Sequence, residues 1–134
     1  LKATRNYIRT VLQVPFYDLL FFHDYDEAPC VTLKKAQVKE RYCAEMDDAH
    51  VLLVQDEIES WYAAGIGGEL TGRVDLREIR QTDGLKKEHV EGLMPAGYSS
   101  FILFRQAILS EFDLDAARQR NRSFDYFCRK HLGL

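Results

Sequence analysis

The sequence contains no hydrophobic run long enough to cross a membrane. Its most apolar stretch covers residues 99–104 and ends at Arg105, whereas a membrane-spanning helix needs about 18 apolar residues. We therefore expect a soluble protein without a membrane partner.

Cysteine is scarce, and its spacing argues against a disulfide framework. The chain has three cysteines, Cys30, Cys43 and Cys128, which is an odd number at wide spacing. Small secreted domains instead carry an even number of closely spaced cysteines. The sequence begins at Leu1 without a secretory leader, which favours a trimmed or excised fragment over a secretory precursor. Both observations favour the reducing cytoplasm.

The sequence also lacks the common catalytic and phosphate-binding motifs. It has no Gly-x-Ser-x-Gly and no His-Glu-x-x-His, and its glycines at 65–68 are not followed by the Lys-Ser or Lys-Thr of a P-loop. We therefore expect a regulatory or binding function rather than catalysis, and no cofactor.

The composition supplies enough hydrophobic material for one compact domain. Of the 134 residues, 46% are hydrophobic and 29% are charged, which is typical of a folded domain of this length. A clear alternation of Val- and Ile-rich strands with helices is missing. The sequence therefore predicts a compact all-α or mostly α domain over 1–134 rather than a parallel α/β sheet. Residues 70–80 fit either a minor β-hairpin or a frayed helix, and residues 16–22 fit either a buried helix or a buried strand.

Capping residues and apolar spacing predict the positions of the helices. The first covers residues 2–14 and is ended by Pro15. The clearest begins at Asp47 or Asp48 and stops at a left-handed Gly65, with one apolar stripe made of Val51, Val54, Ile58, Trp61 and Tyr62. The other expected helices begin at Thr32, near residue 85, at Ser99 or Ser100, at Asp113 and at Ser123.

Charge is segregated along the chain. Between Tyr42 and Gly72 there is no Lys or Arg, and seven carboxylates lie there. Carboxylates beside an aromatic anchor can steer and hold a basic partner protein, although such a face also serves solubility alone. The sequence therefore predicts a small cytoplasmic regulatory or adaptor-type domain that acts by protein–protein interaction. The residues expected to bind the partner are Asp56, Glu57, Glu59, Trp61 and Tyr62.

Self-association is a variant of the same hypothesis. The segment 34–41 is basic, and it precedes the acidic block directly. In a homo-oligomer, this segment of one copy would meet the acidic block of another.

The C-terminal segment 113–134 supports an alternative function, that of a DNA-binding regulator. A helix-turn-helix needs a small residue, a left-handed turn residue four positions later and a cap on the second helix, and Ala117, Asn121 and Ser123 fit these demands. The motif is degenerate, because the unit usually buries apolar side chains where Arg120 and two other basic residues stand. The side chains expected to reach phosphates are Arg118, Arg122, Arg129 and Lys130.

A metal-dependent enzyme is a second alternative. If the helix that begins at Thr32 continues past Asp47, then Cys43, Asp47 and His50 lie on one of its faces. Thiolate, carboxylate and imidazole groups are all zinc ligands. The competing interpretation makes Asp47 a helix cap and Cys43 a small core residue.

Overall fold

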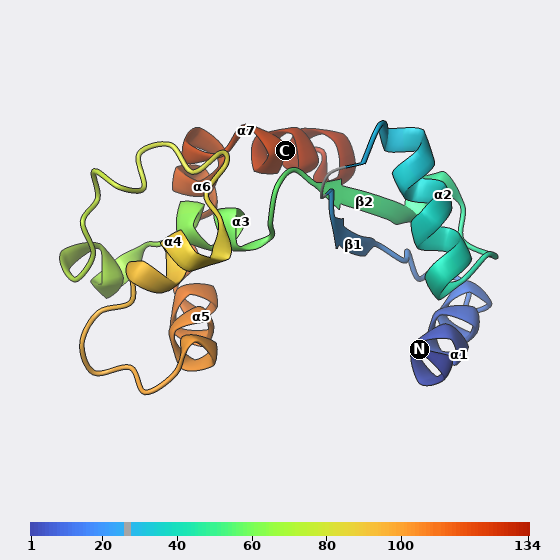
Figure 1. Cartoon of the computed structure of the whole chain (residues 1–134), viewed down its shortest axis with the longest axis horizontal. Helices are drawn as coiled ribbons and strands as arrows, with labels where there is room; N and C mark the ends of the chain where they lie inside the picture. Colours follow the sequence, from blue (N-terminus) through green and yellow to red (C-terminus); the bar gives the residue numbers. More distant parts are fainter. Residues whose placement is uncertain (26–27) are drawn as a thin grey trace. The chain divides into compact units, whose positions relative to one another are not determined.

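The computed structural model describes residues 1–25 and 28–134 (Figure 1). Helices make up most of its regular structure, which confirms the predicted mostly α class. The chain divides into two compact units, Leu1–Val54 and Gln55–Leu134. Each unit has a buried hydrophobic cluster of its own, and the single domain over 1–134 stays a prediction.

The first unit joins two parallel strands through a helix. Its elements are α1 (Lys2–Leu12), β1 (Phe21–Asp24), α2 (Val31–Tyr42), the 3-10 helix η1 (Asp48–His50) and β2 (Val51–Val54). Phe21 lies opposite Val51 in the strand pair, and α2 packs on β2 (Figure 1). Parallel neighbours need such a crossover, because a tight hairpin joins only antiparallel strands. The buried cluster of this unit contains Ile8, Val38, Cys43, Met46 and Val51.

Arg5 on α1 binds the end of α2. The last carbonyl groups of a helix have no partners within it. The guanidinium of Arg5 donates to the carbonyl oxygens of Arg41 and Tyr42, at 3.1 Å each. Ile8, one turn further along α1, is buried in the cluster, so polar and apolar contacts both hold α1 in the unit.

The second unit contains helices and turns. Its elements are α3 (Glu59–Ala64), the 3-10 helix η2 (Gly68–Gly72), α4 (Lys87–Gly92), α5 (Phe101–Ser110), α6 (Leu114–Arg120), α7 (Arg122–Phe127) and the π-helix η3 (Cys128–Leu132). Phe104 and Ile108 of α5 are fully buried in its cluster, together with Ile66, Ile79 and Val90. The predicted core helix around residue 104 is therefore confirmed.

The predicted starts of α5 and α6 are confirmed, because a side chain directly before each helix caps it. The side chains of Ser100 and Asp113 cap α5 and α6 by accepting hydrogen bonds from backbone N–H groups three residues ahead, at 3.3 and 2.9 Å. In contrast, α2 begins after Cys30 rather than Thr32, and α7 begins after Asn121 rather than Ser123. None of the helices in the described part of the chain is long and apolar enough to cross a membrane.

The long helix predicted from Asp47 to Gly65 is wrong. Residues 51–54 form β2, and helix α3 covers only Glu59–Ala64. The run at 51–54 is apolar at every position, so it suits a buried strand as well as a helical stripe, and pairing with β1 makes it a strand. Asp56, with φ of 63°, turns the chain between the two elements. Gly65 ends α3 with φ of −84°, so it is not left-handed.

The β-hairpin considered for residues 70–80 does not form. The structure describes this whole stretch, which completes η2 and continues as turns. Individual apolar residues of this stretch contribute to the core of the second unit. Ile79 is fully buried, and Val74 packs against the same cluster. The two strands of the described residues are β1 and β2, which are parallel. Residues 16–22 were expected to be buried, but only 21–22 join a strand, and most of 16–20 is exposed.

Candidate functional site

Trp61, the expected aromatic anchor, points into the second unit. Its side chain is only 6% exposed, and its ring lies 5.1 and 5.3 Å from the rings of Phe124 and Phe127. The indole Nε1 donates to Ser123 Oγ at 2.7 Å. Trp61 is therefore a core residue that ties α3 to α7 rather than an exposed anchor.

The carboxylates around Trp61 also have partners within the unit. Glu59 is buried beside Arg105, whose guanidinium lies 3.7 Å from its carboxylate. Asp56 lies 3.6 Å from the ammonium of Lys86, and Glu57 accepts a hydrogen bond from the backbone N–H of Lys87. The chain thus brings the predicted binding residues together, but it directs several of them inward.

Tyr62 completes this set as a half-buried residue. It packs against the buried cluster of the second unit, and the guanidinium of Arg105 lies 5.9 Å from its ring centroid. Both aromatic residues of α3 therefore pack within the second unit.

The basic segment 34–41 meets the acidic block within one chain. Lys35 Nζ donates to the carbonyl oxygen of Asp48 at 2.6 Å, and Lys39 Nζ lies 2.5 Å from the Asp48 carboxylate. The hydrogen bond from Lys39 lowers the pKa of that carboxyl. The sequence predicted that the basic segment of one copy meets the acidic block of another. Within one chain, lysines of this segment already bind Asp48, so α2 lies close to η1.

The predicted turn of the helix-turn-helix is wrong. Asn121 has φ of −139° and ψ of 114°, which is extended rather than left-handed, and it alone separates α6 from α7. A DNA-binding unit of this type needs a turn of three or four residues. The amide oxygen of Asn121 instead caps α7 by accepting from the backbone N–H of Phe124 at 2.9 Å.

Asn121 is also the centre of a buried polar network that the sequence reading missed. Its Nδ2 donates to Thr82 Oγ1 at 3.0 Å and to Ser60 Oγ at 3.3 Å, and its Oδ1 accepts from Ser123 Oγ at 2.8 Å. Its partners lie up to 61 residues away in the sequence, so no local signal reveals them. Among the described residues, no buried side-chain nitrogen or oxygen lacks a hydrogen-bond partner.

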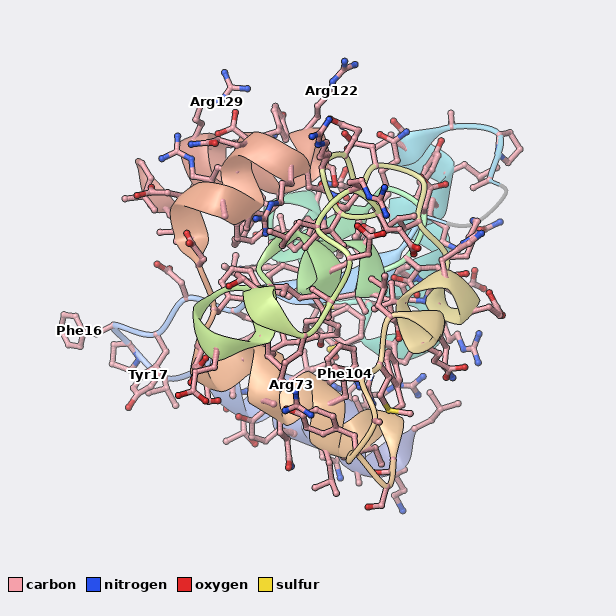
Figure 2. All side chains as sticks on the ribbon, turned by 90° about the vertical axis from the view of Figure 1, so that its left-hand side faces the viewer. Phe16, Tyr17, Arg73, Phe104, Arg122 and Arg129 are labelled. Atoms are coloured by element: carbon pink, nitrogen blue, oxygen red, sulfur yellow. The ribbon has the colours of Figure 1, made fainter. Side chains whose placement is uncertain are left out.

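The basic residues of the C-terminal helices differ in their surroundings. Arg118 and Arg129 both bind the carboxylate of Asp125, at 2.9 and 3.0 Å, and the hydrogen bond from Arg118 lowers the pKa of that carboxyl. Arg122 and Lys130 are exposed. Figure 2 shows the side chains of Arg122 and Arg129 projecting outward from the C-terminal helices. Two of the four predicted phosphate-binding residues are therefore in ion pairs.

The proposed metal ligands do not form a site. Helix α2 ends before Cys43, whose backbone is extended, so Cys43, Asp47 and His50 do not share a helix face. The Cys43 thiol donates to the Glu45 carboxylate at 3.1 Å, and His50 Nδ1 accepts from the backbone N–H of Asp47 at 2.9 Å. Within residues 1–25 and 28–134, no group of three or more potential ligands could hold a metal ion.

Glu45 has a strongly lowered pKa, of about 2. The hydrogen bond from Cys43 is the largest cause, followed by the one from Arg9 of α1. A group whose pKa falls on folding stabilises the fold above its unfolded pKa. This contribution is lost as the pH falls toward 2. The Cys43–Glu45–Arg9 cluster therefore has a structural role at neutral pH.

We expect an alkylating reagent to label only Cys30 in the folded protein. Cys30 is exposed, whereas Cys43 and Cys128 are buried, and burial raises the pKa of both thiols and reduces their thiolate fraction. Intact-mass measurement after iodoacetamide treatment should give one adduct in buffer and three in concentrated urea. Labelling of Cys43 without denaturant would contradict the buried position of this residue.

An exposed aromatic segment between α1 and β1 was also missed by the sequence reading. In residues 14–20, which we call the exposed segment, Phe16 is fully exposed and Tyr17 is 72% exposed. Figure 2 shows both side chains pointing away from the ribbon. Of the described non-glycine residues, only Phe16 and Asp56 have a positive φ, which is 72° at Phe16. The aromatic density was visible in the sequence, but the direction of the rings was not.

Comparisons of this chain with protein-family models, with the curated proteins and with the solved structures find no match.

Proposed function

We propose that the protein is a regulatory or adaptor-type module that binds a partner protein through the exposed segment, residues 14–20. The observation that carries this proposal is Phe16, a bulky aromatic residue that is fully exposed in a left-handed backbone conformation. A non-glycine residue in this region costs on the order of 1–3 kcal/mol and typically occurs where function requires it. An aromatic ring held in water at such a cost is a good candidate for a binding anchor.

The neighbours of Phe16 extend this apolar surface. Tyr17 is largely exposed, and Val14 and Leu20 are partly so. Leu19 packs against the buried cluster of the first unit and holds the segment in place. Contiguous exposed apolar surface of this kind is typical of interaction sites, whereas single exposed apolar residues are ordinary.

The chemistry of the segment favours a protein over a polyanion as partner. The one ionisable group with a formal charge at neutral pH in residues 14–20 is the carboxylate of Asp18, which would repel phosphates. Aromatic side chains are the commonest anchors in protein interfaces, where they fill apolar pockets. The three cysteines are free thiols, which is compatible with the reducing cytoplasm, where we place the protein.

Photo-crosslinking in cells of the source organism tests this proposal. We expect benzoylphenylalanine in place of Tyr17 to give a discrete covalent adduct with one partner protein. The matched control carries the same group in place of Ile102, which is also exposed but lies on α5 of the second unit. An adduct with twice the mass of the chain would identify a second copy as the partner.

The variant Phe16→Asn should abolish the adduct formed from position 17 without unfolding the protein. Asparagine tolerates a positive φ better than phenylalanine, so the backbone is kept while the apolar ring is removed. Circular dichroism spectra of the two proteins should coincide. An adduct that persists in Phe16→Asn, or that forms equally from position 102, would refute the proposed site.

A further inference from the structure

The second unit carries a basic and aromatic face on its last helices. Arg122, Tyr126, Arg129 and Lys130 follow one another at intervals of four, three and one residues, which places them along one side of α7 and η3. We call this set the basic face. Phe124 and Cys128, which alternate with them, are buried, so the opposite side of these helices packs into the protein.

The segment that carries this face has a net charge opposite in sign to that of the whole chain, although Arg118 binds Asp125 and Arg120 donates to backbone carbonyl oxygens. Residues 118–130 contain five basic residues and one acidic residue, a net charge of +4, whereas the whole chain has a formal net charge of −3. Asp125 partly neutralises Arg129, and the Asp83 carboxylate accepts a hydrogen bond from the backbone N–H of Arg122. The guanidinium of Arg122 itself is directed outward (Figure 2), and Arg129 is still 62% exposed.

Tyr126 lies among these cations and adds an aromatic surface. Its side chain is 55% exposed, and Lys130 Nζ lies 5.4 Å from its ring centroid. Proteins that bind single-stranded nucleic acid combine basic side chains along the backbone with aromatic rings on which bases stack. Arginine suits the phosphate groups, because its planar guanidinium can donate two parallel hydrogen bonds.

We propose that the basic face of α7 and η3 binds single-stranded nucleic acid, with Arg122, Arg129 and Lys130 on the phosphates and Tyr126 against a base. Duplex DNA fits less well, because the helices lack the turn that presents a recognition helix to the major groove. An anionic membrane fits less well too, because membrane-surface helices expose an apolar side and Tyr126 is the only aromatic residue among the cations of this face. The basic face shares no residue with the exposed segment, so this proposal does not rest on the proposed function.

Fluorescence anisotropy with a labelled oligothymidylate of about 20 nucleotides tests this proposal. Each phosphate that a cation neutralises contributes about −0.7 to the slope of log affinity against log salt, so three cations predict a slope of about −2. The double variant Arg122→Gln, Lys130→Gln should weaken binding on the order of tenfold and reduce the slope by more than half. Tyr126→Leu should weaken binding about fivefold or more while leaving the slope unchanged.

The matched control is Arg77→Gln, Lys87→Gln. It removes two exposed positive charges from the same unit but from other segments, so affinity and slope should both stay unchanged. The proposal is overturned if the oligonucleotide does not bind at low salt, if a duplex binds more tightly, or if Tyr126→Leu has no effect. Equal weakening by the control pair, or tighter binding to phosphatidylserine vesicles than to the oligonucleotide, would overturn it as well.

Discussion

Replacing Asn121 with alanine is expected to lower the free energy of unfolding of the second unit by about 4 kcal/mol, an effect that is large for a single substitution. Asn121 is 1% exposed, and its amide makes four hydrogen bonds. Alanine removes all four and leaves a small cavity. The Ser60 hydroxyl would then lose a buried partner, whereas the Thr82 hydroxyl would keep its hydrogen bond to the carbonyl oxygen of Arg120. A buried polar group without a partner costs about 1–3 kcal/mol.

The network around Asn121 explains why this loss should spread through the unit. The Ser123 hydroxyl, which donates to Asn121 Oδ1, also accepts from the indole of Trp61. The Thr82 backbone N–H donates to the carbonyl oxygen of Arg120 at 2.8 Å. Asn121 therefore connects α3, the segment before α4 and the start of α7. Removing its amide loosens three elements at once.

Urea unfolding followed by tryptophan fluorescence would measure this effect. Trp61 is the only tryptophan of the chain, and it lies in the second unit beside Phe124. The matched control is Asp113→Ala, which removes the exposed cap of α6 and should cost only about 1 kcal/mol. Equal losses in the two variants would mean that Asn121 acts as an ordinary helix cap.

The sequence predicted those helices whose signals are local. Helix α1 ends before Pro15, and α5 and α6 begin at Ser100 and Asp113, because proline chemistry and capping depend on neighbours within four residues. Strand β2 was missed because its four apolar residues fit both a helical stripe and a buried strand. Only the distant partner β1 distinguishes the two.

In the candidate sites, the direction of each side chain could not be predicted from its neighbours in the sequence. The sequence predicted a partner-binding face around Trp61, but the indole packs against Phe124 and Phe127, more than 60 residues away. Likewise, the exposure of Phe16 depends on a positive φ that no residue type at that position signals. Composition and periodicity therefore located the charged and aromatic segments, whereas tertiary packing decided which of them reach the surface.

Gly65→Ala is expected to destabilise the second unit by about 3 kcal/mol, at the upper end of the usual cost of overpacking. A Cβ atom at Gly65 would lie 1.9 Å from Cε2 of Phe112, with two further atoms of the ring within 2.3 Å. The backbone of Gly65 has φ of −84°, which alanine adopts readily, so the cost is steric rather than conformational. The Gly65 carbonyl oxygen accepts from the backbone N–H of Asp113 at 2.9 Å, which keeps the two segments close together.

Two controls separate this steric cost from a general effect of alanine. Gly72→Ala places a Cβ where no atom lies within 4 Å, so its free energy of unfolding should change by less than about 0.5 kcal/mol. In a Phe112→Ala background, the ring that meets the new Cβ is absent, and Gly65→Ala should then cost less than about 1 kcal/mol. If Gly65→Ala costs the same with and without the Phe112 ring, the close approach of these two residues is not what requires glycine. The difference between the two backgrounds therefore measures how tightly the loop after α3 packs against the ring of Phe112, which follows α5.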